Sequence, residues 1–137
     1  MMARVRQAHT GPELRLRRLL HAAGLRYRLH PRSLPGSPDL VFPKYGAVVF
    51  VHGCFWHRHE GCRHATTPAS RREYWLPKFA ENRRRDERQV RALQEAGWRV
   101  ALVWTCGLTP RSASRTAEEL IVWLASDQPG VELPELR

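Results

Sequence analysis

The most constraining feature of this 137-residue sequence is the stretch 46–64, where a short apolar run leads into a dense group of histidines, cysteines and aromatic residues. The run 47–51 is β-branched and aromatic, which predicts a strand buried on both faces that the chain leaves at Gly53. Buried strands hold their ends rigidly, and the loop that follows can carry reactive side chains. The sequence therefore places its candidate functional site at the exit of this strand.

Part of that loop has the spacing of a metal site. Three cysteines in a chain without a signal-peptide pattern cannot form a complete set of disulfides, and cysteines clustered with histidine indicate zinc instead. The expected ligands are three loop residues and one residue at the end of the later predicted strand 98–104: Cys54, His59, Cys62 and Cys106. Three thiolates and one imidazole form a closed structural zinc site. Either His64 or His57 is an alternative to His59, and three unrelated buried thiols are the alternative to zinc.

The sequence also predicts a catalytic site next to the zinc site. Asp39 begins a strand that a tight turn joins to 47–51, so an antiparallel hairpin would bring it near His52. A carboxylate opposite imidazoles could hold Mg²⁺ against a phosphate while a histidine handles protons. With His59 on zinc, His52 and His57 remain free, and an ordinary pKa of about 6.5 suits acid–base work. The alternative for Asp39 is a turn residue after a proline.

The charge of the chain indicates a polyanionic partner. Lys and Arg number 23 against 13 Asp and Glu, a net charge of +10, and arginine forks match phosphate geometry. This favours a nucleic acid over a merely soluble basic protein. Without a membrane-length apolar stretch or a signal peptide, we expect a cytoplasmic location. Residues 1–9 are expected to be a mobile basic arm that could settle on phosphates, or simply a frayed terminus.

The remaining pattern predicts an α/β domain. A helix over 10–24 starts at the N-cap Thr10, and Glu13 stands at the capping-box position, which gives Glu13 a structural role that competes with a catalytic one. A half-exposed strand is expected at 25–30 and a long helix, broken at Pro77, at 71–96. A last helix is expected at 112–124, beginning at Ser112 or Ser114, and an extended tail at 127–137. A right-handed crossover through the long helix would make the strands 47–51 and 98–104 parallel.

Several motifs together give the sequence a resemblance to a known family. They are Leu34-Pro-Gly-Ser-Pro-Asp39, Val51-His-Gly-Cys-Phe-Trp-His57 and Arg72-Glu-Tyr-Trp-Leu76. Over residues 4–123 the chain resembles the very short patch repair (Vsr) endonucleases, bacterial enzymes that nick DNA on the 5′ side of the thymine in a T:G mismatch. The resemblance implies a single domain over 1–137 with a restriction-endonuclease-like core, a mixed sheet flanked by helices, a structural zinc and Mg²⁺-dependent cleavage. It also implies a monomer that works on mismatched double-stranded DNA at the nucleoid, with mismatch-repair proteins as further partners.

The resemblance also assigns roles to residues. Asp39 matches a metal-binding aspartate, His52 and His57 match two active-site histidines, and Glu13 matches a glutamate that supports the site. The zinc ligands match the four residues named above. Three aromatics match the side chains that wedge into DNA beside the mismatch: Phe55, Trp56 and Trp75. For Phe55 and Trp56, packing over the zinc is the alternative.

Two departures from the family pattern concern metals. Val51 stands where some members have threonine, so the backbone carbonyl of Val51 is the group expected to hold Mg²⁺. The ligand loop 59–62 is one residue longer than in some members. Two other functions fit the sequence: a non-catalytic, zinc-stabilised mismatch-binding module, and a zinc hydrolase in which His57 and His59 are ligands of an open site.

Overall fold

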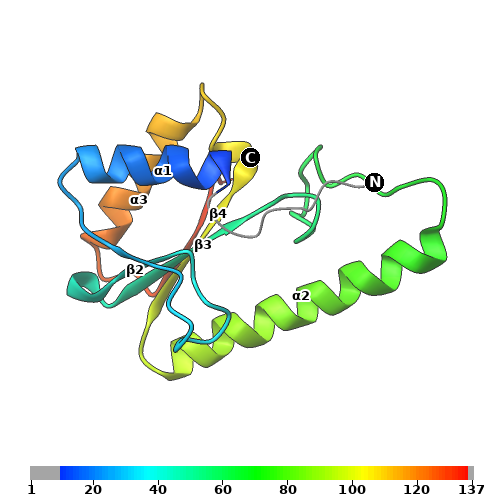
Figure 1. Cartoon of the computed structure of the whole chain (residues 1–137), viewed down its shortest axis with the longest axis horizontal. Coiled ribbons are helices and arrows are strands. Elements are labelled where there is room, and N and C mark those ends of the chain that lie inside the picture. Colours follow the sequence, from blue (N-terminus) through cyan, green and yellow to red (C-terminus); the bar gives the residue numbers. More distant parts are fainter. Residues whose placement is uncertain (1–9, 136–137) are drawn as a thin grey trace.

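The computed structural model describes residues 10–135, so the expected basic arm at 1–9 lies outside the described residues, as do the last two residues of the expected tail. The described chain is a mixed α/β structure with a five-stranded sheet in the order β1-β2-β3-β4-β5 (Figure 1). The strands are β1 Arg28–Leu29, β2 Leu40–Phe42, β3 Ala47–His52, β4 Arg99–Trp104 and β5 Gly130–Leu133. The helices are α1 Gly11–Ala22, α2 Arg72–Glu95 and α3 Ala113–Leu124, with 3-10 turns η1 Pro43–Tyr45 and η2 Thr105–Gly107.

Strand β3 lies at the centre of the sheet. It pairs antiparallel with β2, with Leu40 opposite Val49, and parallel with β4, with His52 opposite Trp104. Both the predicted hairpin and the predicted parallel crossover are confirmed. All but one of the β3 residues are buried, as the apolar run indicated.

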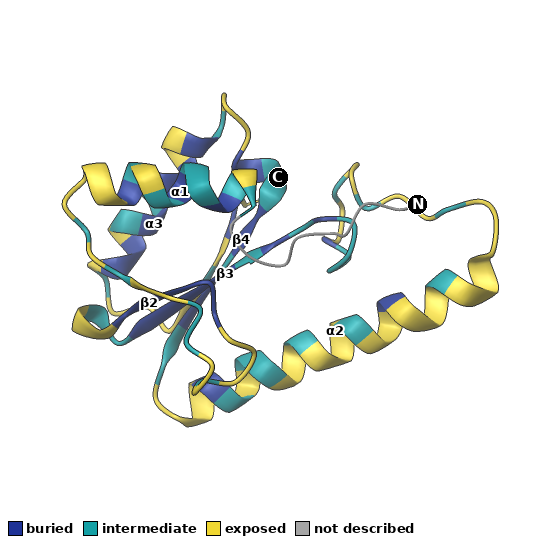
Figure 2. Ribbon diagram, in the orientation of Figure 1, coloured by how far each residue is buried: buried dark blue, intermediate teal, exposed yellow. Residues whose placement is uncertain are grey.

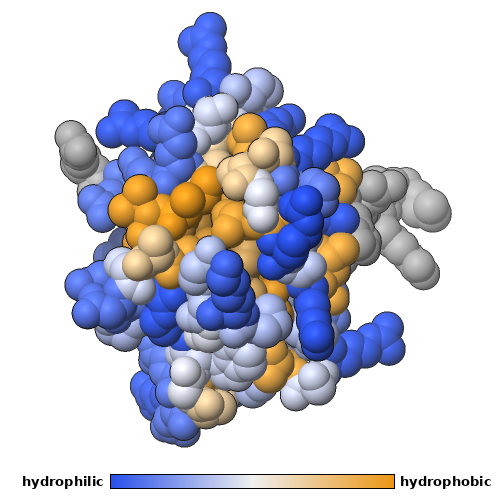
Figure 3. Space-filling model, turned by 90° about the vertical axis from the view of Figure 1, so that its left-hand side faces the viewer, coloured by the Kyte–Doolittle hydropathy of each residue, from blue (hydrophilic) through white to orange (hydrophobic). Residues whose placement is uncertain are grey.

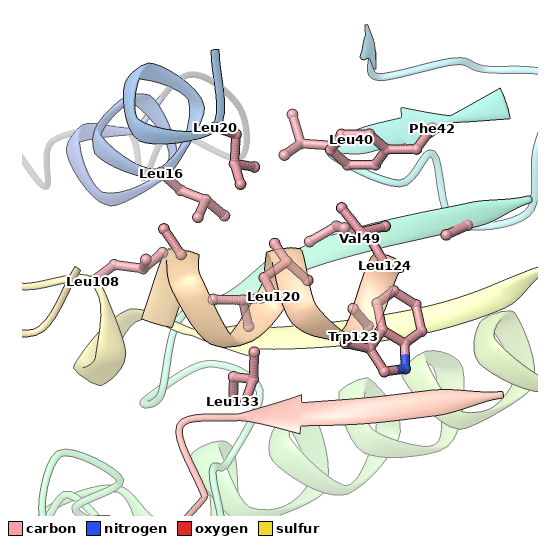
Figure 4. Close-up of a cluster of buried hydrophobic side chains, with 14 of the residues drawn as sticks. Leu16, Leu20, Leu40, Phe42, Val49, Leu108, Leu120, Trp123, Leu124 and Leu133 are labelled. Atoms are coloured by element: carbon pink, nitrogen blue, oxygen red, sulfur yellow. The ribbon is translucent and has the colours of Figure 1, made fainter. Parts of the chain in front are cut away.

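Two layers of apolar side chains sandwich the sheet. On one face α1 and α3 pack over the larger cluster, which includes Leu16, Phe42, Val49 and Leu120 (Figure 4). On the other face the long helix α2 contributes Leu93, which packs with strand residues such as Val48 and Phe50. Much of α2 is exposed along its outer side (Figure 2). The alternation of side chains along β3 therefore decides which helix layer each residue meets.

The helix α2 runs through Pro77, so the predicted break at this proline is wrong. Proline lacks only one backbone N–H, its φ suits a helix, and here it lies close to the helix start. Trp75 and Phe79 stack across this turn with ring centroids 5.8 Å apart, a side-chain pair at helical spacing that supports it. Local packing thus outweighs the loss of a hydrogen bond.

Two predicted segments differ in extent from the strands that the structure shows. The strand expected at 25–30 is reduced to the two residues of β1, after which His30 takes a left-handed φ of 44° before Pro31. The tail expected to be merely extended includes β5, which pairs parallel with β4 through Val131 and Leu133. Both segments are short edge strands, and their order depends on the neighbouring strand more than on their own pattern.

The surface is largely hydrophilic. On the face turned to the viewer in Figure 3, charged and polar side chains surround a more apolar middle. None of the helices in the described part of the chain combines the length and apolar character that crossing a bilayer requires.

Two residues of α3 give a matched test of the core. Leu120 is fully buried and Val122 is 71% exposed. Leu120→Ala is expected to lower the free energy of unfolding by about 2–5 kcal/mol, because it leaves a cavity between α3 and the sheet. Val122→Ala should change it by less than about 0.5 kcal/mol. Urea unfolding followed by circular dichroism measures both, and equal effects would contradict this packing.

Candidate active site and metal-binding cluster

Three groups of metal-ligating side chains gather around the exit of β3. Within each group the ligand atoms lie within 4.8 Å of one another. The groups are Cys54, His59, Cys62 and Cys106; His52, His57 and Asp86; and Glu13, His30 and Asp39. The predicted functional residues are thus close in space, but they divide into separate clusters.

The cysteine–histidine cluster joins the loop after β3 to the end of β4. His59 Nδ1 lies 3.6 Å from Cys54 Sγ and 3.5 Å from Cys106 Sγ. The His59 ring stacks on Trp104 with centroids 4.2 Å apart. The structure therefore places His59 in this cluster, and neither His57 nor His64 belongs to it.

The electrostatics of this cluster favour a bound cation. Burial, and next the neighbouring Cys54 and Cys62, raise the pKa of the Cys106 thiol to about 12. Thiolates packed this closely repel one another unless a cation compensates their charge. Three sulfur atoms and one imidazole nitrogen fit a tetrahedral metal ion with no position left for water. The cluster can therefore hold a metal, and its donor set is of the structural type.

The second cluster holds the two histidines expected to be catalytic. Their rings stack with centroids 3.9 Å apart. His57 Nδ1 lies 2.6 Å from Asp86 Oδ2, a short contact between the loop and α2. A carboxylate at Nδ1 favours the tautomer with its proton there, which leaves Nε2 of His57 as an acceptor. Asp86 therefore fixes the orientation of the His57 ring.

Asp86 is a candidate site residue that the sequence pattern does not single out. It lies among arginines, a pattern typical of a solvated helix face. Its spacing carries a signal, since Phe79, Asp86 and Leu93 recur every seven residues, and Phe79 and Leu93 are buried. A carboxylate on the inward stripe of a helix that covers the strand exit indicates a polar partner.

His52 does not keep the pKa expected of a free imidazole. Burial, and next the neighbouring His57, lower its pKa to about 3, although Asp86 acts in the opposite direction. The ring is only 6% exposed and packs against Phe50 and Trp104. His52 is therefore a neutral hydrogen-bonding group at neutral pH.

An open cavity of about 410 Å³ lies beside the two histidines. The cavity is lined by α2, β4, β5 and the loop after β3. Its charged lining residues include arginines and glutamates: Arg58, Arg83, Arg91, Glu60, Glu87 and Glu132. Glu132 accepts a hydrogen bond from the Trp104 indole at 2.7 Å, which holds one wall in place. The histidine cluster is thus reachable from solvent.

The third cluster joins α1 to the start of β2. Asp39 Oδ2 accepts the Val51 backbone N–H at 2.6 Å, and His30 Nε2 lies 3.0 Å from Glu13 Oε2. The structure thus groups Asp39 with Glu13 and His30, and connects it to His52 through the neighbouring Val51. The Thr10 hydroxyl accepts the Glu13 N–H at 3.3 Å, so the predicted helix cap is also present.

The surroundings of Asp39 disfavour its charged form. Burial, and to a smaller extent the charge of Glu13, raise its pKa from 3.8 to about 8, although the hydrogen bond from Val51 acts in the opposite direction. Glu13 is 1% exposed and Asp39 is 8% exposed. Two buried acids side by side fit a bound divalent cation.

The three expected wedge aromatics form one group over the first half of α2. Phe55 and Trp56 have centroids 5.1 Å apart, and Trp56 and Trp75 lie 5.7 Å apart. Phe55 also meets the buried Phe79 at 5.3 Å. All three are partly exposed, so their rings both pack together and reach the surface.

Comparison with known proteins adds to this geometry. The family described as DNA mismatch endonuclease Vsr matches residues 1–63. The type II nicking enzyme V.XorIIP of Xanthomonas oryzae is 53% identical over 113 residues, 82% of each chain. The DNA mismatch endonuclease Vsr of Escherichia coli is 44% identical over 121 residues, which cover 86% of this chain and 77% of that protein. The type II nicking enzyme V.NmeAIP of Neisseria meningitidis is 36% identical over 84% of this chain and 81% of its own length.

These similarities define the class of protein as a DNA endonuclease, a hydrolase whose relatives include nicking enzymes. The chain belongs to the Vsr family of DNA mismatch endonucleases. Family membership excludes the alternative of a module without enzymatic activity.

The raised pKa of the buried Asp39 can be tested through the pH dependence of the free energy of unfolding. In Mg²⁺-free buffer the folded protein holds a proton on Asp39 up to a pKa of about 8, whereas the unfolded chain releases it near 3.8. The stability of the wild type relative to Asp39→Asn should therefore fall as pH rises from about 4 to about 8. Urea unfolding at intervals across this range measures the difference. Substituting the exposed Asp127→Asn is the control, and a difference independent of pH would contradict the assignment.

Proposed function

We propose that this protein nicks double-stranded DNA on the 5′ side of the thymine in a T:G mismatch, in an Mg²⁺-dependent reaction of very short patch mismatch repair. The support is the family resemblance, together with relatives named as a mismatch endonuclease and as nicking enzymes. The observation that carries the proposal is the His57–Asp86 pair stacked on a neutral His52, beside the cluster that contains Asp39. The core would be of the restriction-endonuclease type, in one domain.

His57 is the proposed general base. Because Asp86 accepts its Nδ1–H, the free Nε2 can take a proton from an attacking water. Asp86 also stabilises the imidazolium that forms when the proton arrives. His57 is partly exposed at the cavity, where water and a phosphate can reach it.

His52 is proposed to stabilise charge. A neutral imidazole can donate a hydrogen bond to the developing negative charge or to the leaving oxygen, and its burial keeps this donor in a fixed position. Its stacking on His57 places both rings at the same side of the cavity.

Asp39, with the backbone carbonyl of Val51, is proposed to hold Mg²⁺, and Glu13 supports the site from α1. The bound cation would supply Lewis-acid polarisation of the scissile phosphate. The Val51 N–H fixes the Asp39 carboxylate at the end of β3, next to His52 in the chain.

Recognition of the substrate is assigned to the aromatic group and the basic surface. Phe55, Trp56 and Trp75 would enter the duplex beside the mismatch, where apolar wedges unstack a base step. The exposed arginines of α2 would contact phosphates. We propose a monomer acting at the nucleoid in the bacterial cytoplasm, with mismatch-repair proteins as further partners.

The function is tested with a panel of duplexes that carry each mismatch in varied flanking sequences. The expected result is Mg²⁺-dependent cleavage of the thymine-containing strand at T:G, with matched duplexes left intact. Strand-resolved gel electrophoresis gives the position of the cut. Cleavage of both strands, or equal nicking of matched DNA, would contradict the proposal.

The same nicking assay tests the role proposed for Asp39. Asp39→Ala should reduce nicking by at least about a hundredfold, because the cation loses its main carboxylate, while DNA binding measured by gel shift is retained. The control Asp127→Ala changes an exposed carboxylate and should nick normally. Retained cleavage by Asp39→Ala would refute the role given to Asp39.

The cysteine–histidine cluster is proposed to hold a structural Zn²⁺. The expected ligands Cys54, His59, Cys62 and Cys106 tie the loop after β3 to the end of β4, next to both the histidines and the aromatic wedge.

Zinc removal distinguishes the proposed structural zinc from the catalytic zinc of the zinc-hydrolase alternative. Chelation of zinc, or Cys106→Ala, should abolish cooperative thermal unfolding, because metal binding and folding are coupled at a closed site. Circular dichroism measures the thermal unfolding, and mass spectrometry measures the zinc content. His64→Ala, which changes an exposed loop histidine outside the cluster, is the control. A chelated protein that stays folded but loses activity would favour an open catalytic zinc.

A further inference from the structure

The cluster around Asp39 contains a histidine to which the mechanism above gives no role. His30 lies between two acids: its Nε2 is 3.0 Å from Glu13 Oε2, and its Nδ1 is 3.5 Å from Asp39 Oδ1. The His30 side chain is 21% exposed, whereas that of Glu13 is 2% exposed. His30 is therefore the more accessible member of a site that is otherwise largely buried.

The two contacts of the ring differ in kind. The Nε2 to Glu13 distance is that of a hydrogen bond, whereas 3.5 Å from Nδ1 to Asp39 is long for one. Two ligands about 2.1 Å from one shared ion lie about 3.0 to 3.4 Å apart, depending on the angle between them. The Nδ1 to Asp39 spacing is close to that range. Histidines that ligate metals commonly donate their other N–H to a carboxylate, which is the position of Glu13.

We propose that His30 Nδ1 is a ligand of the cation held by Asp39, with Glu13 accepting the His30 Nε2–H and fixing the ring. The site then has one nitrogen donor in addition to oxygen donors. Mg²⁺ prefers oxygen ligands alone, whereas first-row transition cations such as Mn²⁺ and Co²⁺ accept imidazole readily. The imidazole therefore makes the site bind a divalent transition cation more tightly than Mg²⁺, and Mg²⁺, which the proposed function uses for cleavage, binds the same position with lower affinity.

The backbone around His30 supports a fixed ring. His30 directly follows β1, and its N–H donates to the Asp39 carbonyl at 3.3 Å, so the two residues are paired through main chain as well as side chain. Asp39 is held in turn by Val51. A metal ligand positioned by two strands needs little rearrangement to bind.

This inference rests on the proposed placement of a catalytic cation at Asp39, and the test separates the two. The probe is Mn²⁺ alone, added to the zinc-loaded full chain and followed by electron paramagnetic resonance, with Mg²⁺ as a competitor. In the wild type, pulsed measurements should show nitrogen coupling to bound Mn²⁺. In His30→Gln this coupling should disappear, and the preference for Mn²⁺ over Mg²⁺ should fall by about tenfold or more. His21→Gln changes an exposed histidine on α1 and should behave as the wild type.

The other possible results separate a failure of the His30 inference from a failure of the cation placement at Asp39. If Asp39→Asn loses both cations while the wild type shows no nitrogen coupling, the cation lies at Asp39 without His30, and only this inference fails. If His30→Gln weakens Mg²⁺ and Mn²⁺ equally, His30 positions Asp39 without ligating, and the inference also fails. If Asp39→Asn binds both cations as the wild type does, the cation placement under the proposed function fails as well. The wild-type spectrum decides the matter even where His30→Gln does not fold.

Discussion

The site depends on one constraint, which is that β3 is buried between two helix layers and can carry polar side chains only where it ends. Its neighbours fix that end from both sides. Asp39 accepts the Val51 N–H from the β2 side, and Trp104 of β4 lies opposite His52 and stacks on His59. Groups from distant parts of the sequence therefore converge within a few residues of one strand end.

This convergence also explains why the same loop serves two clusters. His57 and His59 are two residues apart, yet one binds Asp86 of α2 and the other joins the cysteines near β4. A metal that fixed His59 would limit the movement of His57, since the chain between them is one residue long. The cysteine cluster can thus affect catalytic geometry without contact with the reacting groups.

The sequence was sufficient to predict the central part of the fold and to bring most of the candidate site residues to the end of one strand. The run 47–51, the turn before it and the long crossover predicted β3, its hairpin with β2 and its parallel neighbour β4, because burial and chain connectivity dictate these features. The spacing of Cys54, His59 and Cys62 identified three members of one cluster. What the sequence could not supply were contacts decided by three-dimensional packing. Asp86 lies in a run of arginines, His30 follows the two-residue edge strand β1, and β5 is ordered by its pairing with β4.

The structure also gives the two candidate catalytic histidines different environments. His52 is buried and its pKa is lowered to about 3, whereas His57 is paired with a carboxylate at one nitrogen and open at the other. Environments that differ in this way assign different tasks to identical side chains. A buried neutral ring is a poor proton acceptor, which supports the proposal that His57, oriented by Asp86, is the general base. Burial and one hydrogen bond thus support the different roles proposed for the two histidines.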